Sequence, residues 1–269
     1  MDTSLGQLIA EGRTAEVYAL DEDRVIKLFY DWCPSPWIQQ EIEIANFIAS
    51  MPIPSPKALK SIEIKGRQGI IYERVNGPSM LKLSTARPWM LFHFARQLAE
   101  LHTEIHKNKV NGLPSQRNAL AGVIQQLKSL SPDIKASVLK LLDELPDGNT
   151  LCHFDFHPDQ VLITNNGPVI IDWMTAQQGH PHSDVARTCI ILKFGQVPYG
   201  SWAMRRIINM WRGIFYQTYI RHYLVLNPGV SKEKIINWMI PVAAGRLDEA
   251  IPDECEPILR FIQSYLLIQ

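Results

Sequence analysis

The sequence lacks the features that mark secreted, membrane-spanning and zinc-binding proteins. Its N-terminus has no basic segment followed by an apolar core, so we expect no signal peptide. No apolar run approaches the ~18 residues of a membrane span. The four cysteines are scattered and form no CxxC pair, which argues against a zinc site and for a reducing compartment. These absences predict a cytoplasmic protein.

An excess of charge is also absent. The 27 Lys and Arg residues balance 27 Asp and Glu residues, and no Lys/Arg-rich block occurs. We therefore expect neither nucleic acid nor a membrane as a partner, and no obligate protein partner is evident. Apolar residues make up 46% of the 269 residues and charged residues 20%, which is typical of a globular chain with one large domain or two lobes.

The most informative stretch of the sequence is residues 152–173. Two short β-branched runs flank an Asn-Gly turn there, a pattern that predicts a hairpin. His153, Asp155 and Gln160 lie just before the first run, and Asp172 lies just after the second. The hairpin would therefore bring a histidine, two carboxylates and a carboxamide to one end of a rigid unit.

This set of side chains suits phosphoryl transfer. A kinase needs a carboxylate to orient the attacking hydroxyl and accept its proton, and oxygen ligands to hold Mg²⁺ on the nucleotide phosphates. The kinase catalytic loop leaves four residues between its base Asp and its metal-binding Asn. The same spacing separates Asp155 from Gln160, although the amide is one methylene longer than Asn. Asp172 would be the second metal ligand.

At these residues the chain resembles the aminoglycoside phosphotransferase and choline kinase-like family. The family signature reads His-Gly-Asp-Leu-His-Pro-Gly-Asn, then apolar residues, then Ile-Asp-Trp or Ile-Asp-Phe. The matching residues here are His153-Phe154-Asp155-Phe156-His157-Pro158-Asp159-Gln160 and Ile171-Asp172-Trp173. The resemblance implies an α+β, two-lobed protein-kinase-like fold and ATP-dependent phosphorylation of a hydroxyl on a small molecule. It also implies ATP or GTP and Mg²⁺ as cofactors.

Residues 1–76 are predicted to form a small β-rich lobe that binds the nucleotide. Gly12 lies in a turn whose backbone amides can cover phosphates. Lys27 lies in a Val-Ile-Lys strand similar to the Val-Ala-Ile-Lys strand of kinases and would neutralise phosphate charge. Glu41, on a predicted helix, would hold Lys27, and Glu43 is the alternative. The predicted strands are 7–10, 16–20, 25–29, 61–64 and 69–73, and the predicted helix is 37–49.

The end of this lobe is predicted near Asn76. Glu73 and Val75 close the last strand and open a link, where a hinge would present backbone groups to adenine. Residues 77–269 would then form the catalytic and acceptor-binding lobe. Its predicted helices are 88–105, 118–127, 132–145, 202–226, 232–244 and 257–267.

Several polar residues of the second lobe are predicted to be structural. Asp184 lies in a Gly-x-Pro-x-x-Asp segment similar to one in the family, where the Asp braces the catalytic loop. His153 would belong to the same supporting layer, and His102 closes a long helix. His180 and His182 lie close enough in sequence for a metal pair, but no Cys or Glu stands at ligand spacing, so we do not predict a metal there.

The C-terminal region offers two features that could recognise a cationic acceptor. Acidic residues between helices are usually solvated, however, and aromatic residues on helices usually belong to the core. The acidic cluster comprises Asp248, Glu249, Asp253, Glu254 and Glu256, and the aromatic residues are Trp202, Trp211, Tyr216, Tyr219, Tyr223 and Trp238.

Two other readings of the sequence stay open. Gln160 and the single glycine of the predicted phosphate loop are compatible with a nucleotide-binding pseudokinase or regulatory module without phosphotransfer. A protein kinase is disfavoured, because Asp-Phe-Gly and Ala-Pro-Glu are missing. Only residues 173–183 separate Asp172 from Asp184, which leaves little room for an activation segment.

Overall fold

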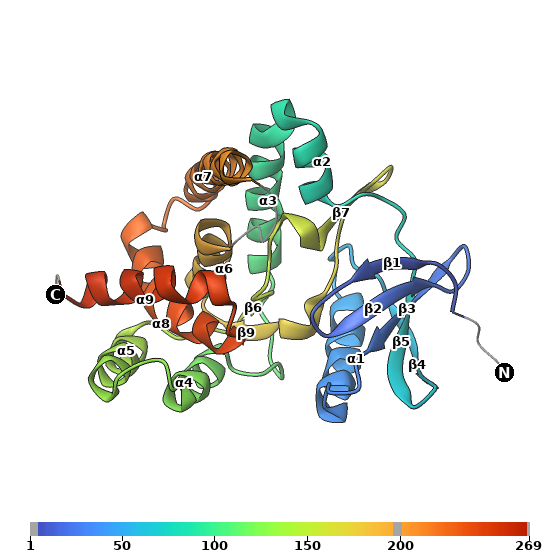
Figure 1. Cartoon of the computed structure of the whole chain (residues 1–269), viewed down its shortest axis with the longest axis horizontal. Helices are drawn as coiled ribbons and strands as arrows, with labels where there is room; N and C mark the ends of the chain where they lie inside the picture. Colours follow the sequence, from blue (N-terminus) through green and yellow to red (C-terminus); the bar gives the residue numbers. More distant parts are fainter. Residues whose placement is uncertain (1–4, 196–200, 268–269) are drawn as a thin grey trace. The chain divides into compact units, whose positions relative to one another are not determined.

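The computed structural model describes residues 5–195 and 201–267. The chain divides into two compact units (Figure 1). The first comprises the residues up to Thr85 together with Asp159–Thr175, and the second comprises Ala86–Pro158 and the residues from Ala176 onward. Within the described residues, no helix is both long enough and apolar enough to cross a bilayer.

The first unit is built on a five-stranded antiparallel sheet in the order β1-β2-β3-β5-β4. Side chains alternate between the faces of a strand, so Ile26 and Leu28 pack on one face and Phe29 packs on the other. Helix α1 covers the second face, where its Ile38 packs against Phe29. The elements are β1 (Leu8–Glu11), β2 (Ala15–Ala19), β3 (Arg24–Phe29), α1 (Ser35–Ala49), β4 (Ala58–Ile64), β5 (Arg67–Glu73) and α2 (Met80–Ala86).

The predicted hairpin is present and belongs to the first unit. It consists of η2 (Pro158–Gln160), β7 (Val161–Thr164) and β8 (Gly167–Ile170), followed by η3 (Trp173–Thr175). Its two-residue turn is Asn165-Asn166, and Gly167 opens β8 with a φ of 110°, which only glycine adopts at low cost. Backbone hydrogen bonds attach the hairpin to earlier segments of the unit, since Ile163 N donates to Pro78 O and Ile170 N to Pro54 O. These bonds explain why residues 159–175 belong to the first unit. The lobe boundary that we predict near Asn76 places the same residues in the second lobe.

The second unit is mainly helical, with one short antiparallel pair of strands, β6 and β9. Helix α6 lies at its centre, because 11 of its 14 residues are buried. Helices α7, α8 and α9 all pack against α6. The elements are η1 (Pro88–Met90), α3 (Leu91–His106), α4 (Gln116–Gln126), α5 (Pro132–Glu144), β6 (Thr150–Cys152), β9 (Gln177–Gly179), α6 (Pro181–Phe194), α7 (Trp202–Leu226), α8 (Lys232–Arg246), η4 (Leu247–Glu249) and α9 (Pro252–Leu266).

The predicted helices agree with the structure except at three places, the first of which is α2 (Met80–Ala86) of the first unit, which was not predicted. Helix α6 was not predicted, because a helix that is buried on nearly all sides has no polar face to produce a period. Helix α9 begins at Pro252, five residues before the predicted start at 257. Proline is favoured in the first turn of a helix and acidic residues are favourable there; Asp253 and Glu254 follow Pro252 directly.

Candidate functional site

The first unit holds a cluster of polar side chains around Lys27, here called the lysine cluster (Lys27, Glu41, Tyr72, Gln160 and Asp172). Lys27 Nζ lies 2.8 Å from Glu41 Oε1 and 2.8 Å from Asp172 Oδ1. Tyr72 Oη donates to the same Glu41 oxygen at 2.9 Å. Burial by itself would lower the pKa of Lys27, but the carboxylates of Asp172 and Glu41 outweigh it and raise the pKa. The ammonium is therefore charged at neutral pH.

The local structure explains why Glu41 rather than Glu43 contacts Lys27. Lys27 alternates with Ile26 and Leu28 along β3 and so points to the face that α1 covers. Glu41 follows the buried Ile38 by three residues and lies on the same side of α1. Glu43, two positions later, is exposed and accepts a hydrogen bond from Gln39.

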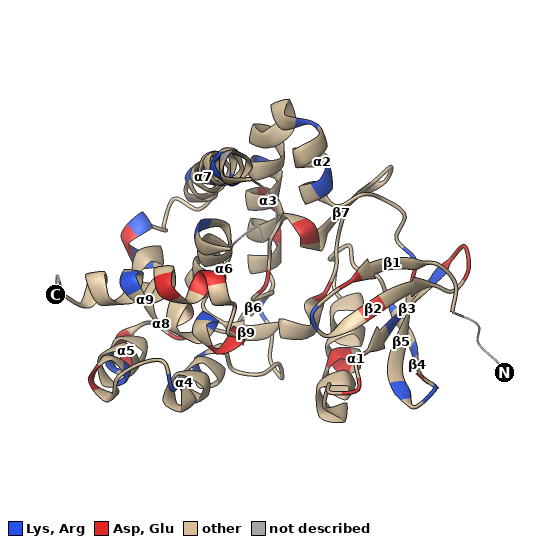
Figure 2. Ribbon diagram, in the orientation of Figure 1, with Lys and Arg blue, Asp and Glu red and all other residues tan. Residues whose placement is uncertain are grey.

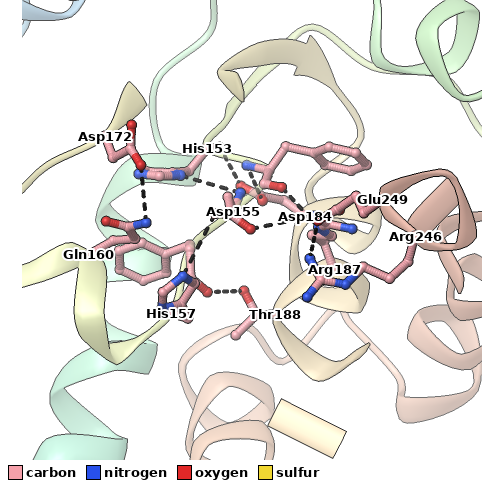
Figure 3. A network of polar contacts seen from close by, with 12 residues as sticks. His153, Asp155, His157, Gln160, Asp172, Asp184, Arg187, Thr188, Arg246 and Glu249 are labelled. Atoms are coloured by element: carbon pink, nitrogen blue, oxygen red, sulfur yellow. Dashed lines mark hydrogen bonds and ion pairs between the residues drawn. The ribbon is translucent and has the colours of Figure 1, made fainter. Parts of the chain in front are cut away.

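Asp172 and Gln160 lie at one end of the hairpin, as the sequence predicted. Ile171 N donates to Gln160 O at 3.0 Å, which fixes the two segments next to each other. Gln160 Nε2 lies 3.3 Å from Asp172 Oδ2, so the longer amide still reaches the carboxylate (Figure 3). Asp172 has a φ of 62°, in the left-handed region, and its side chain is 34% exposed. A partly exposed carboxylate beside an amide suits a hard cation such as Mg²⁺, which takes oxygen ligands and keeps several waters.

The second unit holds the loop that carries Asp155. The carboxylate of Asp184 lies under this loop and accepts hydrogen bonds from two successive backbone groups, His153 N at 2.7 Å and Phe154 N at 2.8 Å. His153 in turn accepts a hydrogen bond from Asp155 N through Nδ1. Phe154 has a φ of 62°, which is a strained conformation for a bulky residue. The loop conformation therefore depends on Asp184, a fully buried residue of α6.

Two histidines of α3 complete the surroundings of Asp184. His106 Nε2 lies 3.2 Å from Asp184 Oδ2, and its Nδ1 lies 2.8 Å from Tyr223 Oη. His102 Nε2 lies 3.0 Å from the same oxygen without regular hydrogen-bond geometry, and its Nδ1 lies 2.6 Å from Tyr219 Oη. With the protons on Nε2, each imidazole faces the carboxylate and accepts from a tyrosine hydroxyl. This arrangement gives each ring a tyrosine partner and gives His106 a hydrogen bond to Asp184, whereas His102 Nε2 has only a close contact with the carboxylate.

The carboxylate of Asp155 lies beside a guanidinium and an imidazole. Arg187 Nη2 lies 3.4 Å from Asp155 Oδ1, and His157 Nε2 lies 3.7 Å from Oδ2 (Figure 3). Burial by itself would raise the pKa of Asp155, but the contacts with His157 and Arg187 outweigh it and hold the pKa below its usual range. Thr188 Oγ1 donates to Phe156 O at 2.7 Å and fixes the following part of the loop.

Three members of the acidic cluster are paired with arginines, the exposed Glu256 with Arg260 and the other two as follows. Asp and Glu residues gather around η4 and the start of α9 (Figure 2). Glu249 contacts Arg187 through one oxygen and Arg246 through the other. Glu254 is buried and receives Arg246 Nε at 2.8 Å. These pairs form a chain of alternating charge from Asp155 to Glu254, so much of the predicted cluster is neutralised inside the unit.

Three of the six aromatic residues noted in the sequence belong to the core. Tyr219, Tyr223 and Trp238 are buried, and the two tyrosines support His102 and His106 as described above. Trp202 is 74% exposed at the start of α7, where its ring faces the guanidinium of Arg206. The buried tyrosines therefore hold the loop of Asp155 in place and present no face to a ligand.

The remaining predicted residues lie in the first unit. Gly12 forms the tight turn between β1 and β2, where its N donates to Ala15 O at 2.9 Å. Glu73 ends β5, and its carboxylate accepts from Lys57 N. Val75 lies in the link between β5 and α2. Their roles in nucleotide binding stay predictions.

Sequence reasoning missed three residues that complete these clusters. Tyr72 lies on β5, which pairs with the strand of Lys27. Nothing in the sequence distinguishes it from a core tyrosine. Arg187 follows Asp184 by three residues, which places both on one side of α6; this spacing is a signal that could have been used. Glu249 was noted only as one of several acidic residues.

Comparison with known proteins places the chain in a family. The model of the phosphotransferase enzyme family (APH) matches residues 6–228, which is most of the chain. The chain belongs to this family, and the prediction of a phosphotransferase is confirmed. A comparison with curated proteins gave no match.

Several solved structures of similar fold are aminoglycoside phosphotransferases. A variant of APH(4)-Ia in complex with AMP-PNP and hygromycin B has a TM-score of 0.66 at 16% identity, over 96% of this chain and 91% of that chain. An aminoglycoside-3'-phosphotransferase of type VIII has a TM-score of 0.62 at 18% identity, over 89% of this chain and 91% of that chain. ADP-bound APH(2'')-Ib has a TM-score of 0.57 at 14% identity, over 98% of this chain and 93% of that chain. These likenesses confirm the predicted kinase-like fold, with a β-rich lobe and a larger helical lobe.

The left-handed backbone of Phe154 leads to a test with two substitutions. Both Phe154→Gly and Phe154→Ala remove the ring, but only glycine removes the strain of a φ of 62°. We expect the glycine variant to be more stable than the alanine variant by about 1 kcal/mol in urea unfolding. Ala250→Gly, at another left-handed position with a φ of 50°, is the matched control and should also stabilise. Equal stability of the two Phe154 variants would contradict this account.

The buried His106 predicts how stability depends on pH. Burial and the neighbouring His102 lower the pKa of His106 to about 4 in the folded protein, against 6.5 when it is unfolded. The unfolded chain therefore binds the extra proton first, and stability falls as the pH drops from 6.5 towards 4. This difference corresponds to at most about 3 kcal/mol.

Urea unfolding between pH 7.5 and 4.5 measures this loss. His106→Gln, which does not titrate, should show a smaller loss over this range than the wild type. His222→Gln, on α7 and paired with Glu100, is the control for replacing a histidine by glutamine elsewhere in the unit. Parallel curves for the wild type and His106→Gln would rule out His106 as the source.

Proposed function

We propose that the protein transfers the γ-phosphoryl group of ATP or GTP to a hydroxyl group of a small molecule, with Mg²⁺ on the nucleotide phosphates. The observation that carries this proposal is the position of Lys27, 2.8 Å from both Glu41 and Asp172. In kinases the strand lysine, the helix glutamate and the metal-binding aspartate must all be in place for transfer. The family match and the nucleotide complexes of similar structures point the same way.

The first 76 residues would bind the nucleotide. Lys27 neutralises charge on the phosphates, and Glu41 holds its ammonium in place. The turn at Gly12 offers backbone amides to the phosphates. The backbone from Glu73 to Val75 would contact adenine or guanine, and its side chains need no particular identity for this role.

Asp172 and Gln160 would hold Mg²⁺. Asp172 directs Oδ1 to Lys27, and Oδ2 faces the Gln160 amide. When bound, the ion neutralises charge that builds up on the phosphate oxygens. The short hairpin makes these two side chains a rigid pair, because the backbone bond from Ile171 to Gln160 fixes their separation.

Asp155 would orient the acceptor and accept its proton. The acceptor oxygen forms a bond to the γ-phosphorus while the bond from that phosphorus to the bridging oxygen breaks, and ADP or GDP leaves. The hydroxyl proton passes to the Asp155 carboxylate. The pKa of Asp155 lies below its usual range, so the group is ionised, and its main contribution is to position the hydroxyl in a loose transition state. His153 and Asp184 would support it through the loop backbone.

The acceptor is a hydroxylated small molecule, either aminoglycoside-like or another metabolite. Hygromycin B is present in one of the structures with a similar fold. Glu249 and Glu254, two of the residues on which a cationic acceptor would depend, face arginines in this chain. A cationic group is therefore not required by the charges of this region.

A nucleotide-binding module without phosphotransfer is the second candidate. Two residues favour it, since Phe154 replaces the glycine and Gln160 the asparagine of the family signature. The contacts that hold the loop of Asp155 argue for the enzyme, because a module that only binds nucleotide does not need Asp155 held in a defined position.

A screen of hydroxylated small molecules for acceptor-dependent ADP release tests the proposed function. Asp155→Asn is the control, because it removes the proton acceptor and preserves the shape of the side chain. We expect turnover to fall on the order of 10²–10⁴-fold in this variant while nucleotide affinity stays within a few-fold. Normal turnover in the folded variant would remove Asp155 from the reaction. Nucleotide binding without release of ADP for any acceptor would favour the second candidate.

A Mg²⁺ titration tests the role of Gln160. An amide oxygen is a suitable ligand, but the extra methylene moves it by roughly 1.5 Å unless the loop adjusts, and Mg²⁺ tolerates little error in geometry. We expect Gln160→Ala to raise the Mg²⁺ concentration needed for half-maximal activity. The concentration for Gln160→Asn should lie between those of the wild type and the alanine variant. Superimposable curves for all three proteins would show that Gln160 is not a ligand.

A further inference from the structure

Arg187 is the one residue that contacts both the loop backbone and the carboxylate of Asp155 among the contacts described for the second unit. Its Nε donates to Phe154 O at 3.1 Å, and its Nη2 lies 3.4 Å from Asp155 Oδ1. Nη2 also contacts Glu249 Oε1. The side chain is only 7% exposed. One guanidinium thus bridges the residue before the proposed base, the base itself and η4 (Figure 3).

These three acceptors define the orientation of the guanidinium. Its donors lie in one plane in a fixed fork, so simultaneous contacts through Nε and Nη2 leave no freedom of rotation. The ring of Phe154 lies 5.7 Å from the guanidinium carbon and adds a further contact. A lysine ammonium at this position could not satisfy the same three partners, because it is a point charge without a planar fork.

We propose that Arg187 is a positioning residue for Asp155: it binds Oδ1 and the Phe154 carbonyl and so leaves Oδ2 as the oxygen that receives the acceptor's proton. This inference rests on the proposed function, in which Asp155 is the base. Oδ2 lies 3.7 Å from His157 Nε2, farther than Oδ1 is from Arg187. The geometry therefore assigns different tasks to the two oxygens of one carboxylate.

Glu249 keeps Arg187 in this position. Arg187 is shared between two carboxylates, and Arg246 Nη1 binds the second oxygen of Glu249 at 2.7 Å. Glu249 therefore cannot turn away from Arg187 without losing Arg246. Because the Arg187 guanidinium also binds Glu249 and the Phe154 carbonyl, it contacts one oxygen of Asp155 and does not bind both.

The charge of Arg187 gives the inference a readout that does not depend on activity. An Arg beside an Asp commonly lowers the carboxyl pKa by about 1 to 3 pH units. Carboxyl-carbon NMR of protein labelled at Asp, with the Asp155 signal assigned from Asp155→Asn, measures this directly. The other titratable or charged groups near Asp155 are His153 and His157 on its own loop, Arg246 on α8, and Glu249 on η4 behind Arg187.

The main variant is the double substitution Arg187→Gln with Glu249→Gln. It avoids leaving the charge of Glu249 without Arg187, and Arg246 keeps its contact with Glu254. We expect the Asp155 midpoint to rise by about 1 to 3 pH units relative to the wild type. Arg187→Lys serves where the double variant does not fold; it retains the charge, so the midpoint should stay low while the orientation is lost.

Kinetics of both variants separate positioning from stability. Misplacing a reacting group by about 1 Å can cost on the order of 10²-fold, so we expect kcat to fall about 10- to 100-fold with nucleotide KM within a few-fold. Arg212→Gln is the matched control, because Arg212 is a partly buried arginine of α7 that binds only backbone carbonyls of α6 in its described hydrogen bonds. It should leave both the Asp155 midpoint and kcat near those of the wild type.

An unchanged Asp155 midpoint in the double variant, or a kcat in Arg187→Lys equal to that of the Arg212→Gln control, would overturn the inference. These outcomes differ from a failure of the proposed function. If the wild type transfers no phosphoryl group to any acceptor, the proposed function fails, and the NMR titration still decides whether Arg187 determines the state of Asp155.

Discussion

The second unit depends on one buried carboxylate. Asp184 is fully buried, accepts two backbone hydrogen bonds from the loop at His153 and Phe154, and faces two imidazoles of α3. A buried charge without such partners would cost several kcal/mol. Burial by itself would raise the pKa of Asp184, but the contacts with His102 and His106 outweigh it and hold the pKa well below its usual value. The loop conformation and the ionisation of this group therefore support each other, and the strained backbone of Phe154 persists because both of its polar backbone groups are bound.

Helix α6, which carries Asp184, also carries a second charged residue that contacts the loop, Arg187. Arg187 lies one turn further along α6, so a single helix supplies both the carboxylate that binds the loop backbone and the cation that binds Asp155. Glu249 and Arg246 extend the alternation to η4 and α8. Each charged side chain in this series is stabilised by its neighbours, so removing one of them leaves its neighbours without an ion-pair partner. We therefore expect neutral double substitutions to be tolerated better than single ones.

The sequence was most informative where chemistry needs fixed spacing along the chain. The positions of Asp155, Gln160 and Asp172 around a short hairpin follow from local turn chemistry, and the choice of Glu41 over Glu43 follows from helical periodicity. The contact between Arg187 and Glu249 could not be predicted, because 62 residues separate them and helix packing determines the pairing. Helix α6 was missed since burial on nearly all sides removes the amphipathic pattern. The left-handed backbone at Phe154 runs against the preference of a bulky residue and is visible only in the fold.

The energetics of the lysine cluster bear on whether this chain is an enzyme or a binding module. A buried ion pair usually contributes little to stability, and apolar side chains of similar volume often replace it at no cost. Lys27 and Glu41 are both largely buried, yet they are charged residues in the middle of a sheet and a helix that otherwise bury apolar side chains. Asp172 adds a third charge on a left-handed backbone, which is itself unfavourable. Stability alone gives no reason for this combination at one place, whereas phosphoryl transfer requires all three groups together. The free-energy cost of burying these charges together is therefore better explained by an enzyme than by a module that only binds nucleotide.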